Sequence, residues 1–218
     1  MACDRGVTCH LQCEIRSVRV TGLGCGGGTG GELFLRCLVP AGGGRAIQID
    51  TRGADQPDGL GETTTGGAVS WRDVASLSCD GSPACVRDLV DRGAVVFEVR
   101  WRGGRRRAVL LGRVLGSELV GRAEVPWRDA GGSGDVAVAV ERRVELATPS
   151  SRRALGQEAR AILSARMSVR VSETPVPAGR RRAANSAAHP QGQSGCEWSA
   201  GDEDVFAAVA CAADDAFE

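Results

Sequence analysis

The sequence has no lysine and no tyrosine, and its 218 residues include a single asparagine, Asn185. These three residue types have AT-rich codons, so their scarcity is typical of a GC-rich gene. All 27 basic side chains are arginine. Because codon bias accounts for this, an arginine at any one position is weak evidence for a bidentate contact.

The chain also lacks a net charge, although its charges are unevenly spread. Three of the 27 basic and seven of the 27 acidic residues lie from Thr174 onward, so the preceding part carries +4 and the tail −4. Domains that bind double-stranded nucleic acid usually have a pI above about 9. The sequence therefore predicts no nucleic-acid partner.

The sequence contains no CxxC motif, and its N-terminus lacks the apolar segment that is expected of a secretory signal. The nine cysteines have irregular spacing, which predicts reduced thiols in a cytoplasmic protein. Arg113 and Glu118 interrupt the longest apolar run, so it is not expected to cross a membrane. Cys3 and Cys9 suggest acylation, but Ala2 excludes myristoylation and unmodified thiols are the simpler expectation.

Catalytic patterns are missing as well. The two histidines, His10 and His189, are not accompanied by a GxSxG motif, a cysteine–histidine pairing or paired carboxylates. The sequence therefore predicts that the protein is not an enzyme and that it holds no cofactor.

One glycine-rich motif has the outline of a dinucleotide fingerprint. Gly22, Gly24 and Gly27 fit GxGxxG after a strand, and Asp50 follows at the end of a later strand. The fingerprint needs a helix to begin within the glycines. Here a β-type segment follows and soon reaches Pro40, so a glycine-rich loop is the favoured interpretation.

Apolar residues alternate with polar ones in several short segments, which is the pattern of half-buried β-strands. In the first segment the alternation of Leu11, Cys13 and Ile15 slips to Val18 and Val20, which predicts a β-bulge. The predicted strands are Leu11–Val20, Glu32–Val39, Arg45–Thr51, Val69–Cys79, Ala94–Arg102, Leu119–Ala130, Val136–Ala147 and Ala161–Val171, with a short helix or turn over Cys85–Arg92. Eight strands separated by glycine-rich turns favour an all-β, antiparallel sandwich or barrel.

The segment from Ala94 to Ala130 joins a strand to an arginine-rich loop. Trp101 is predicted to be exposed beside the basic residues Arg100, Arg102, Arg105, Arg106 and Arg107. Each basic residue near an anionic lipid surface is worth about 1 kcal/mol, and Trp101 suits insertion at the interface. The open alternative is a solvated loop whose arginine stems cover apolar surface.

Four segments, in order, resemble the C2 domain family, a β-sandwich module typical of membrane-targeted signalling proteins. SVRVTGL resembles the opening strand, VSWRDVASLSC resembles the segment with its tryptophan at Trp71, and AVVFEVRWR resembles a later strand. LVGRAEVPWRDA resembles a further strand, matched at Gly121, Ala123, Val125 and Pro126. The resemblance implies a non-enzymatic binding module of the plant-type, calcium-independent form.

Calcium-binding members of this family gather aspartates in the loops at one end of the sandwich. The first such loop here offers only Glu32, and the later family positions fall on Trp101, Gly103, Ser117 and Glu118. Calcium takes about six to eight oxygen ligands. The resemblance therefore implies that no metal is bound.

The composition changes after Glu173, which divides the chain into a C2-like sandwich over 8–173, a disordered linker over 174–200 and an acidic amphipathic helix over 201–218. Arg180–Arg182 could act in nuclear import, although a solvated linker is favoured. On one face of the predicted helix lie Val205, Phe206, Val209 and Phe217. A frayed, alanine-rich terminus is the alternative.

Two functions are consistent with these features. The first is calcium-independent, peripheral association with an anionic phospholipid membrane or a protein partner through Trp101 and the arginines 102 and 105–107. The second is a protein–protein adaptor that docks its C-terminal helix into a groove. The expected location is cytoplasmic, at the membrane surface when lipid is bound, and the sequence does not indicate an oligomeric state.

Overall fold

A computed structural model describes residues 7–23, 31–51, 68–103, 117–129, 139–149, 160–175, 197–200 and 208–210. The main elements are β1 (Val7–Thr21), β2 (Gly31–Gly42), β3 (Arg45–Thr51), β4 (Val69–Gly81), α1 (Pro83–Arg92), β5 (Ala94–Gly103), β6 (Glu118–Pro126), the 3₁₀ turn η1 (Trp127–Asp129), β7 (Val140–Glu145) and β8 (Ile162–Pro175). Two further strands, β9 (Glu197–Ala200) and β10 (Ala208–Ala210), lie near the C-terminus.

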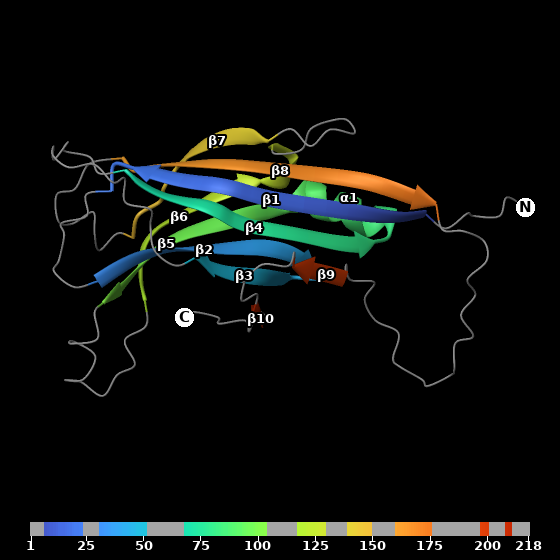
Figure 1. Cartoon of the computed structure of the whole chain (residues 1–218), viewed down its shortest axis with the longest axis horizontal. Helices are drawn as coiled ribbons and strands as arrows, with labels where there is room; N and C mark the ends of the chain where they lie inside the picture. The colour runs from blue at the N-terminus through green and yellow to red at the C-terminus, as the bar shows by residue number, and fades with distance from the viewer. Residues whose placement is uncertain are drawn as a thin grey trace, which may run out of the picture.

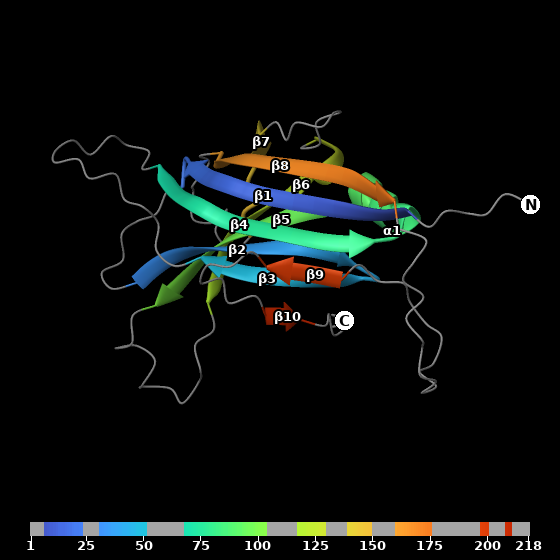
Figure 2. The same ribbon diagram turned by 45° about the vertical axis from the view of Figure 1, so that its right-hand side comes forward.

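The strands form two antiparallel sheets that pack face to face (Figure 1). The first sheet has the order β7-β8-β1-β4-β9, and the second has the order β10-β3-β2-β5-β6. Figure 2, a view turned by 45°, shows the same two layers, with α1 at the end of the sandwich opposite the arrowheads of β1 and β5. The fold is therefore the antiparallel sandwich that the sequence predicted.

The alternation of buried and exposed residues explains why these segments form strands. Leu11, Cys13 and Ile15 point into the core, and the register of β1 against both neighbours shifts between Ile15 and Ser17. After the shift, Val18 and Val20 are buried. The predicted bulge is confirmed, and its effect is to keep both apolar runs of β1 on the core face.

The core lies between the two sheets and contains three large aromatic side chains, Trp71, Phe97 and Trp127. The indole nitrogens of Trp71 and Trp127 have no hydrogen-bond partner among the described residues. An unsatisfied buried donor costs about 1–3 kcal/mol, which the burial of a large aromatic surface offsets.

The helix α1 crosses one end of the sandwich between β4 and β5. Ser82 caps its N-terminus by accepting from the backbone N–H of Cys85 at 3.3 Å, and Pro83 occupies its first turn. Val86 and Leu89 are buried against the core. The short helix or turn predicted over this segment is thus a full helix of 10 residues.

The glycine-rich motif is only partly described, because Gly24 and Gly27 lie outside the described residues. The first described element after it is the strand β2 (Gly31–Gly42). A strand presents no helix N-terminus to a pyrophosphate, so the loop interpretation of the motif itself stays a prediction.

The C-terminal region differs from the linker and helix predicted from its composition. Strand β8 continues to Pro175, β9 pairs with β4, and β10 pairs with β3. The segment 174–200 was predicted to be a disordered linker, but both of its ends belong to strands. The segment 201–218 was predicted to be a helix, but residues 208–210 form a strand. The physical reason is that β3 and β4 would be edge strands without β10 and β9, and the unpaired backbone groups of an edge strand accept another strand.

Candidate functional site

The predicted lipid-binding residues Trp101 and Arg102 lie at the end of β5. Trp101 pairs with Leu33 of β2, and Arg102 pairs with Glu32. Because successive strand residues point to opposite faces, Trp101 and Arg102 lie on opposite faces of the second sheet. The other predicted lipid-binding residues, Arg105, Arg106 and Arg107, lie outside the described residues.

Trp101 is partly buried rather than exposed, which corrects the prediction made for it. Its side chain packs against the main hydrophobic core. A Cβ atom placed on Gly31 would lie 2.2 Å from Cζ2 of the indole ring. The missing side chain at Gly31 therefore makes the space in which Trp101 lies.

Arg102 is exposed and stacks on an aromatic ring at the outer face of the second sheet. Its guanidinium carbon lies 4.7 Å from the centroid of Phe34, and that of Arg36 lies 6.0 Å from the same ring. Phe34 is only 3% exposed, although it points away from the main core. A cation–π contact at such a site is worth about 0.5–1 kcal/mol, and it holds Arg102 close to the sheet.

A chain of charge pairs continues across this outer face. Arg36 donates to both carboxylate oxygens of Asp50, at 2.7 and 2.8 Å. Arg100 donates to Glu98 at 2.6 Å and to the Ser117 hydroxyl at 2.8 Å. The hydrogen bonds from Arg36 lower the pKa of Asp50 below its ordinary value. The basic residues Arg36 and Arg100 on this face are therefore already paired.

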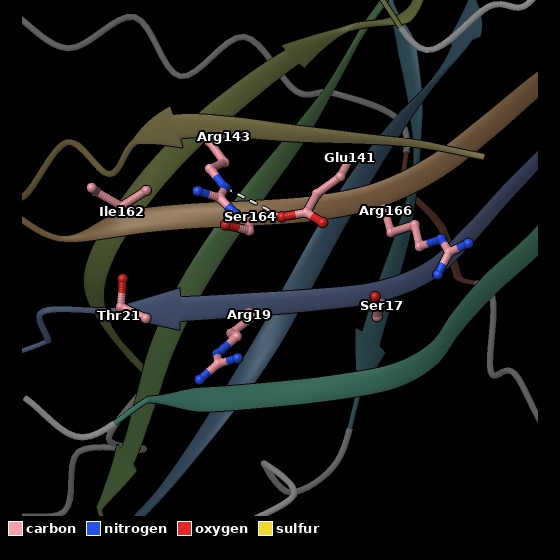
Figure 3. Close-up of a pocket in the computed structure, with 8 residues that line it drawn as sticks. All are labelled: Ser17, Arg19, Thr21, Glu141, Arg143, Ile162, Ser164 and Arg166. Atoms are coloured by element: carbon pink, nitrogen blue, oxygen red, sulfur yellow. Dashed lines mark hydrogen bonds and ion pairs between the residues drawn. The ribbon is translucent and has the colours of Figure 1, made fainter.

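A second basic surface, which the sequence did not reveal, lies on the outer face of the first sheet. It is a hollow of about 410 Å³ over β1, β7 and β8 (Figure 3). Its lining combines long charged side chains, short polar ones and one isoleucine, namely Ser17, Arg19, Thr21, Glu141, Arg143, Ile162, Ser164 and Arg166. We call this surface the arginine hollow.

Strand register explains the shape of the arginine hollow. Ser164 of β8 lies between Arg19 of β1 and Arg143 of β7, as its cross-strand partner on either side. Arg166, two residues further along β8, lies between Ser17 of β1 and Glu141 of β7. Short serine side chains thus form the floor, and long arginine side chains stand around it.

The charges of the arginine hollow are only partly compensated. Arg143 Nε lies 3.2 Å from Glu141 Oε1, and the side chains of this pair are 75% and 54% exposed. Exposed ion pairs of this kind typically contribute about 0–1 kcal/mol. Within the ranges that the structure describes, neither Arg19 nor Arg166 makes a hydrogen bond or an ion pair.

His10 lies in β1, on the sheet surface rather than near a nucleophile. Its Nδ1 atom is 2.9 Å from Asp80 Oδ1 of β4, and both side chains are exposed. His189 is outside the described residues. In the described part of the chain, no three His, Cys, Asp or Glu side chains gather so as to hold a metal ion, and no described helix has the length and apolar character of a membrane span.

Of the four residues predicted to bind a protein partner, only Val209 is described. It belongs to β10, where its backbone pairs with Ile47 of β3. The other three, Val205, Phe206 and Phe217, lie outside the described residues.

Comparison with known proteins gives similarities to solved structures. No family model matches the chain, and no curated protein matches it. Among solved structures the chain is similar to the C2A domain of a plant extended synaptotagmin 1, with 12% sequence identity and a TM-score of 0.38. The match covers 79% of this chain and 97% of that domain. A similarity of this size carries no information about ligand or activity.

Proposed function

We propose that the chain is a non-enzymatic, calcium-independent module that binds anionic phospholipid membranes as a peripheral protein. The observation that carries the proposal is the composition of the connection between β5 and β6. The chain leaves the second sheet at Gly103 and rejoins it at Glu118. The 14 connecting residues, 104–117, contain four arginines, six apolar residues and no acidic residue.

Such a mixture suits the boundary between lipid headgroups and acyl chains. Basic residues near an anionic leaflet contribute about 1 kcal/mol each, and apolar side chains add affinity by leaving water. Arg105, Arg106 and Arg107 follow the last residue of β5 after a single glycine, Gly104, and the exposed Arg102 within β5 adds a further charge. The half-buried Trp101 anchors this end of the strand in the core.

The proposal that calcium is not required rests on the carboxylates at this end of the sandwich. Glu32 pairs with Arg102 across β2 and β5, and Glu118 pairs with Trp101 across β5 and β6. Within the described residues, these two glutamates supply at most four oxygens, whereas calcium takes about six to eight ligands. Binding is therefore expected to be the same in calcium and in a chelator.

The cysteines support a cytoplasmic location. Among the described residues, no disulfide bond involves Cys9, Cys13, Cys37, Cys79 or Cys85. Cysteines without disulfide bonds are typical of a reducing compartment.

The alternative function, an adaptor with a docking helix at the C-terminus, is not proposed. A continuous helical face needs Val209 in helical geometry, and Ala208–Ala210 instead forms a strand. Helix-in-groove docking depends on anchors at helical spacing, and the strand interrupts that spacing.

Sedimentation with vesicles tests the membrane proposal. Wild-type protein is expected to bind vesicles that contain phosphatidylserine, to bind less as the salt concentration rises, and not to bind pure phosphatidylcholine. The charge-reversing variant Arg105→Glu/Arg106→Glu is expected to lose at least about 30-fold in affinity, since two contributions of about 1 kcal/mol are removed.

The matched control is Arg87→Glu/Arg92→Glu on α1, which makes the same change in net charge at the opposite end of the sandwich. This control is expected to bind like wild type. Equal losses in the two variants would show a nonspecific charge effect, and binding that appears only with calcium would overturn the calcium-independent mechanism.

A further inference from the structure

We propose that the arginine hollow is a binding site for a phosphate monoester. The site is separate from the connection between β5 and β6, and the proposal does not rest on membrane binding by that connection. It rests on the register, the uncompensated charge and the shape of the outer face of the first sheet.

The register places three arginine residues around Ser164. Ser164 has Arg19 and Arg143 as its direct cross-strand neighbours and Arg166 two positions along its own strand. Neighbouring strands are about 4.8 Å apart, and residues two apart on one strand are about 6.6 Å apart. The backbone positions of all three arginines therefore lie within the length of one arginine side chain from Ser164.

A second hydroxyl extends the site along β1. Ser17 lies directly opposite Arg166 and two residues before Arg19. Figure 3 shows Arg143 beside Ser164, while the side chain of Arg166 extends from β8 away from Ser164, at the end of the hollow where Ser17 lies. The hollow is therefore elongated, with a hydroxyl and at least one guanidinium at each end.

The charge balance favours an anion. Arg19 and Arg166 make no ion pair or hydrogen bond with any described residue, and Arg143 has a single bond to Glu141 at 3.2 Å. Arginines held on one face of a sheet repel one another. A doubly charged anion seated among them removes this repulsion, while Glu141 remains paired with Arg143.

The chemistry of the lining selects a monoester over other anions. A phosphate monoester carries nearly two negative charges at neutral pH and presents three terminal oxygens. Guanidinium groups bind such oxygens in a bidentate fashion, and the serine hydroxyls donate to those that remain. A diester has one charge and two terminal oxygens, so it matches fewer of these donors.

The size of the hollow agrees with a small phosphorylated group. Its volume of about 410 Å³ falls within the range of about 300–1,000 Å³ that is usual for small-molecule sites. The same chemistry is offered by a free metabolite and by the headgroup of phosphatidic acid. Thr21 and Ile162, the last cross-strand pair of β1 and β8, line one end of the hollow.

Calorimetric titration with glycerol 3-phosphate, and sedimentation with vesicles containing phosphatidic acid, test the two sources of this ligand. Saturable 1:1 binding of glycerol 3-phosphate would identify a free metabolite as a competent ligand. The lipid headgroup would be identified as the ligand if glycerol 3-phosphate does not bind and the protein binds phosphatidic acid vesicles more tightly than phosphatidylserine vesicles of equal charge. Dimethyl phosphate, a diester, is expected to bind at least tenfold more weakly than the monoester.

Two variants test the residues. Arg19→Gln/Arg143→Gln removes two guanidinium groups, and Ser164→Leu fills the floor without changing the charge. Each is expected to weaken monoester binding at least tenfold while the circular dichroism spectrum stays unchanged. The control Arg16→Gln/Arg170→Gln removes two arginines from the same sheet outside the hollow and is expected to stay within twofold of wild type.

The proposal is overturned by any of three results. These are no saturable binding in either arm, equal affinity for the monoester and the diester, or equal losses in the hollow variants and the control. Its failure is distinguishable from failure of the membrane proposal, because the variant Arg105→Glu/Arg106→Glu leaves the arginine hollow intact and is expected to bind glycerol 3-phosphate normally.

Discussion

Trp198 of β9 packs edge-on against Trp127, with 6.1 Å between the ring centroids and 76° between the ring planes. Trp198 Nε1 also donates to the backbone oxygen of Ala41, at 3.3 Å. Strand β9 belongs to the first sheet and Ala41 to β2 of the second. One side chain from the C-terminal region thus connects the two sheets at an open side of the sandwich.

We expect Trp198→Ala to lower the free energy of unfolding by about 1–2 kcal/mol. This is less than the roughly 3–5 kcal/mol typical of a fully buried tryptophan, because Trp198 is only half-buried. Urea unfolding, followed by circular dichroism, measures the change. Trp198→Phe keeps a ring against Trp127 but loses the hydrogen bond to Ala41, so a smaller loss of about 0.5–1.5 kcal/mol is expected. Unchanged stability in Trp198→Ala would show that β9 does not dock in solution.

Gly121 of β6 is a second sensitive position, because a side chain there would collide with Leu146. A Cβ atom on Gly121 would lie 2.5 Å from Leu146 Cδ2, and Leu146 is buried. We expect Gly121→Ala to cost about 1–3 kcal/mol, as is usual for overpacking, measured by denaturant unfolding.

The double variant Gly121→Ala/Leu146→Ala tests the cause. Shortening Leu146 removes the collision, so the double variant is expected to be more stable than the sum of the two single effects predicts. If the effects of the two single variants on the free energy of unfolding simply add, the destabilisation in Gly121→Ala comes from the backbone and not from a collision with Leu146.

The pair between Arg36 and Asp50 predicts a pH dependence of stability. The pKa of Asp50 is lowered in the folded chain, chiefly by the hydrogen bonds from Arg36. The stabilisation that the Arg36–Asp50 pair contributes is therefore complete above the pKa of Asp50 in the unfolded chain, about 3.9. It is lost as the pH falls through the lower pKa that Asp50 has in the folded chain. Because the pair is partly exposed, about 0.2–1 kcal/mol is expected.

Asp50→Asn is the variant that isolates this contribution. Its difference in unfolding free energy from wild type is expected to be present at pH 7 and to shrink as the pH is lowered below about 4. Chemical denaturation at a series of pH values measures it. A difference that stays constant down to pH 2 would contradict an ionic origin.

The buried cysteines are expected to resist alkylation in the folded protein. Burial raises the pKa of Cys13 to about 12, with a further contribution from Glu14, and burial also raises the pKa of Cys37. The thiolate is the reactive form. At pH 8, iodoacetamide is therefore expected to modify the more accessible Cys85 and to spare Cys13 and Cys37.

Peptide mapping by mass spectrometry measures this protection. In urea all three cysteines are expected to react, which is the internal control. Rapid labelling of Cys13 under native conditions would show that the first sheet opens locally.

The strands were predictable from the sequence because a strand with one buried face has an apolar residue at every second position. The slip between Ile15 and Val18 even located the bulge of β1. The prediction that Trp101 is exposed was wrong, because the neighbouring arginines suggested a surface loop. The space beside Gly31 that holds the indole ring exists only because β2 pairs with β5.

The strand at residues 197–200 is a second feature that the sequence alone did not predict. Residues 197–200 follow a segment that is poor in apolar residues, and nothing local in them indicates a strand. Their strand forms because β4 offers an unpaired edge and Trp127 offers a ring to Trp198. Both partners are distant in the chain, so a local pattern does not contain them.

By itself, the sequence determined the all-β class, most of the strand positions and the bulge, because each of these follows from residues that are neighbours along the chain. Only the tertiary structure decided which strands are adjacent. Arg19 and Arg143 are 124 residues apart in the chain, yet they flank Ser164 in one sheet. Pairing between strands depends on contacts across the whole fold, and the arginine hollow exists only through that pairing.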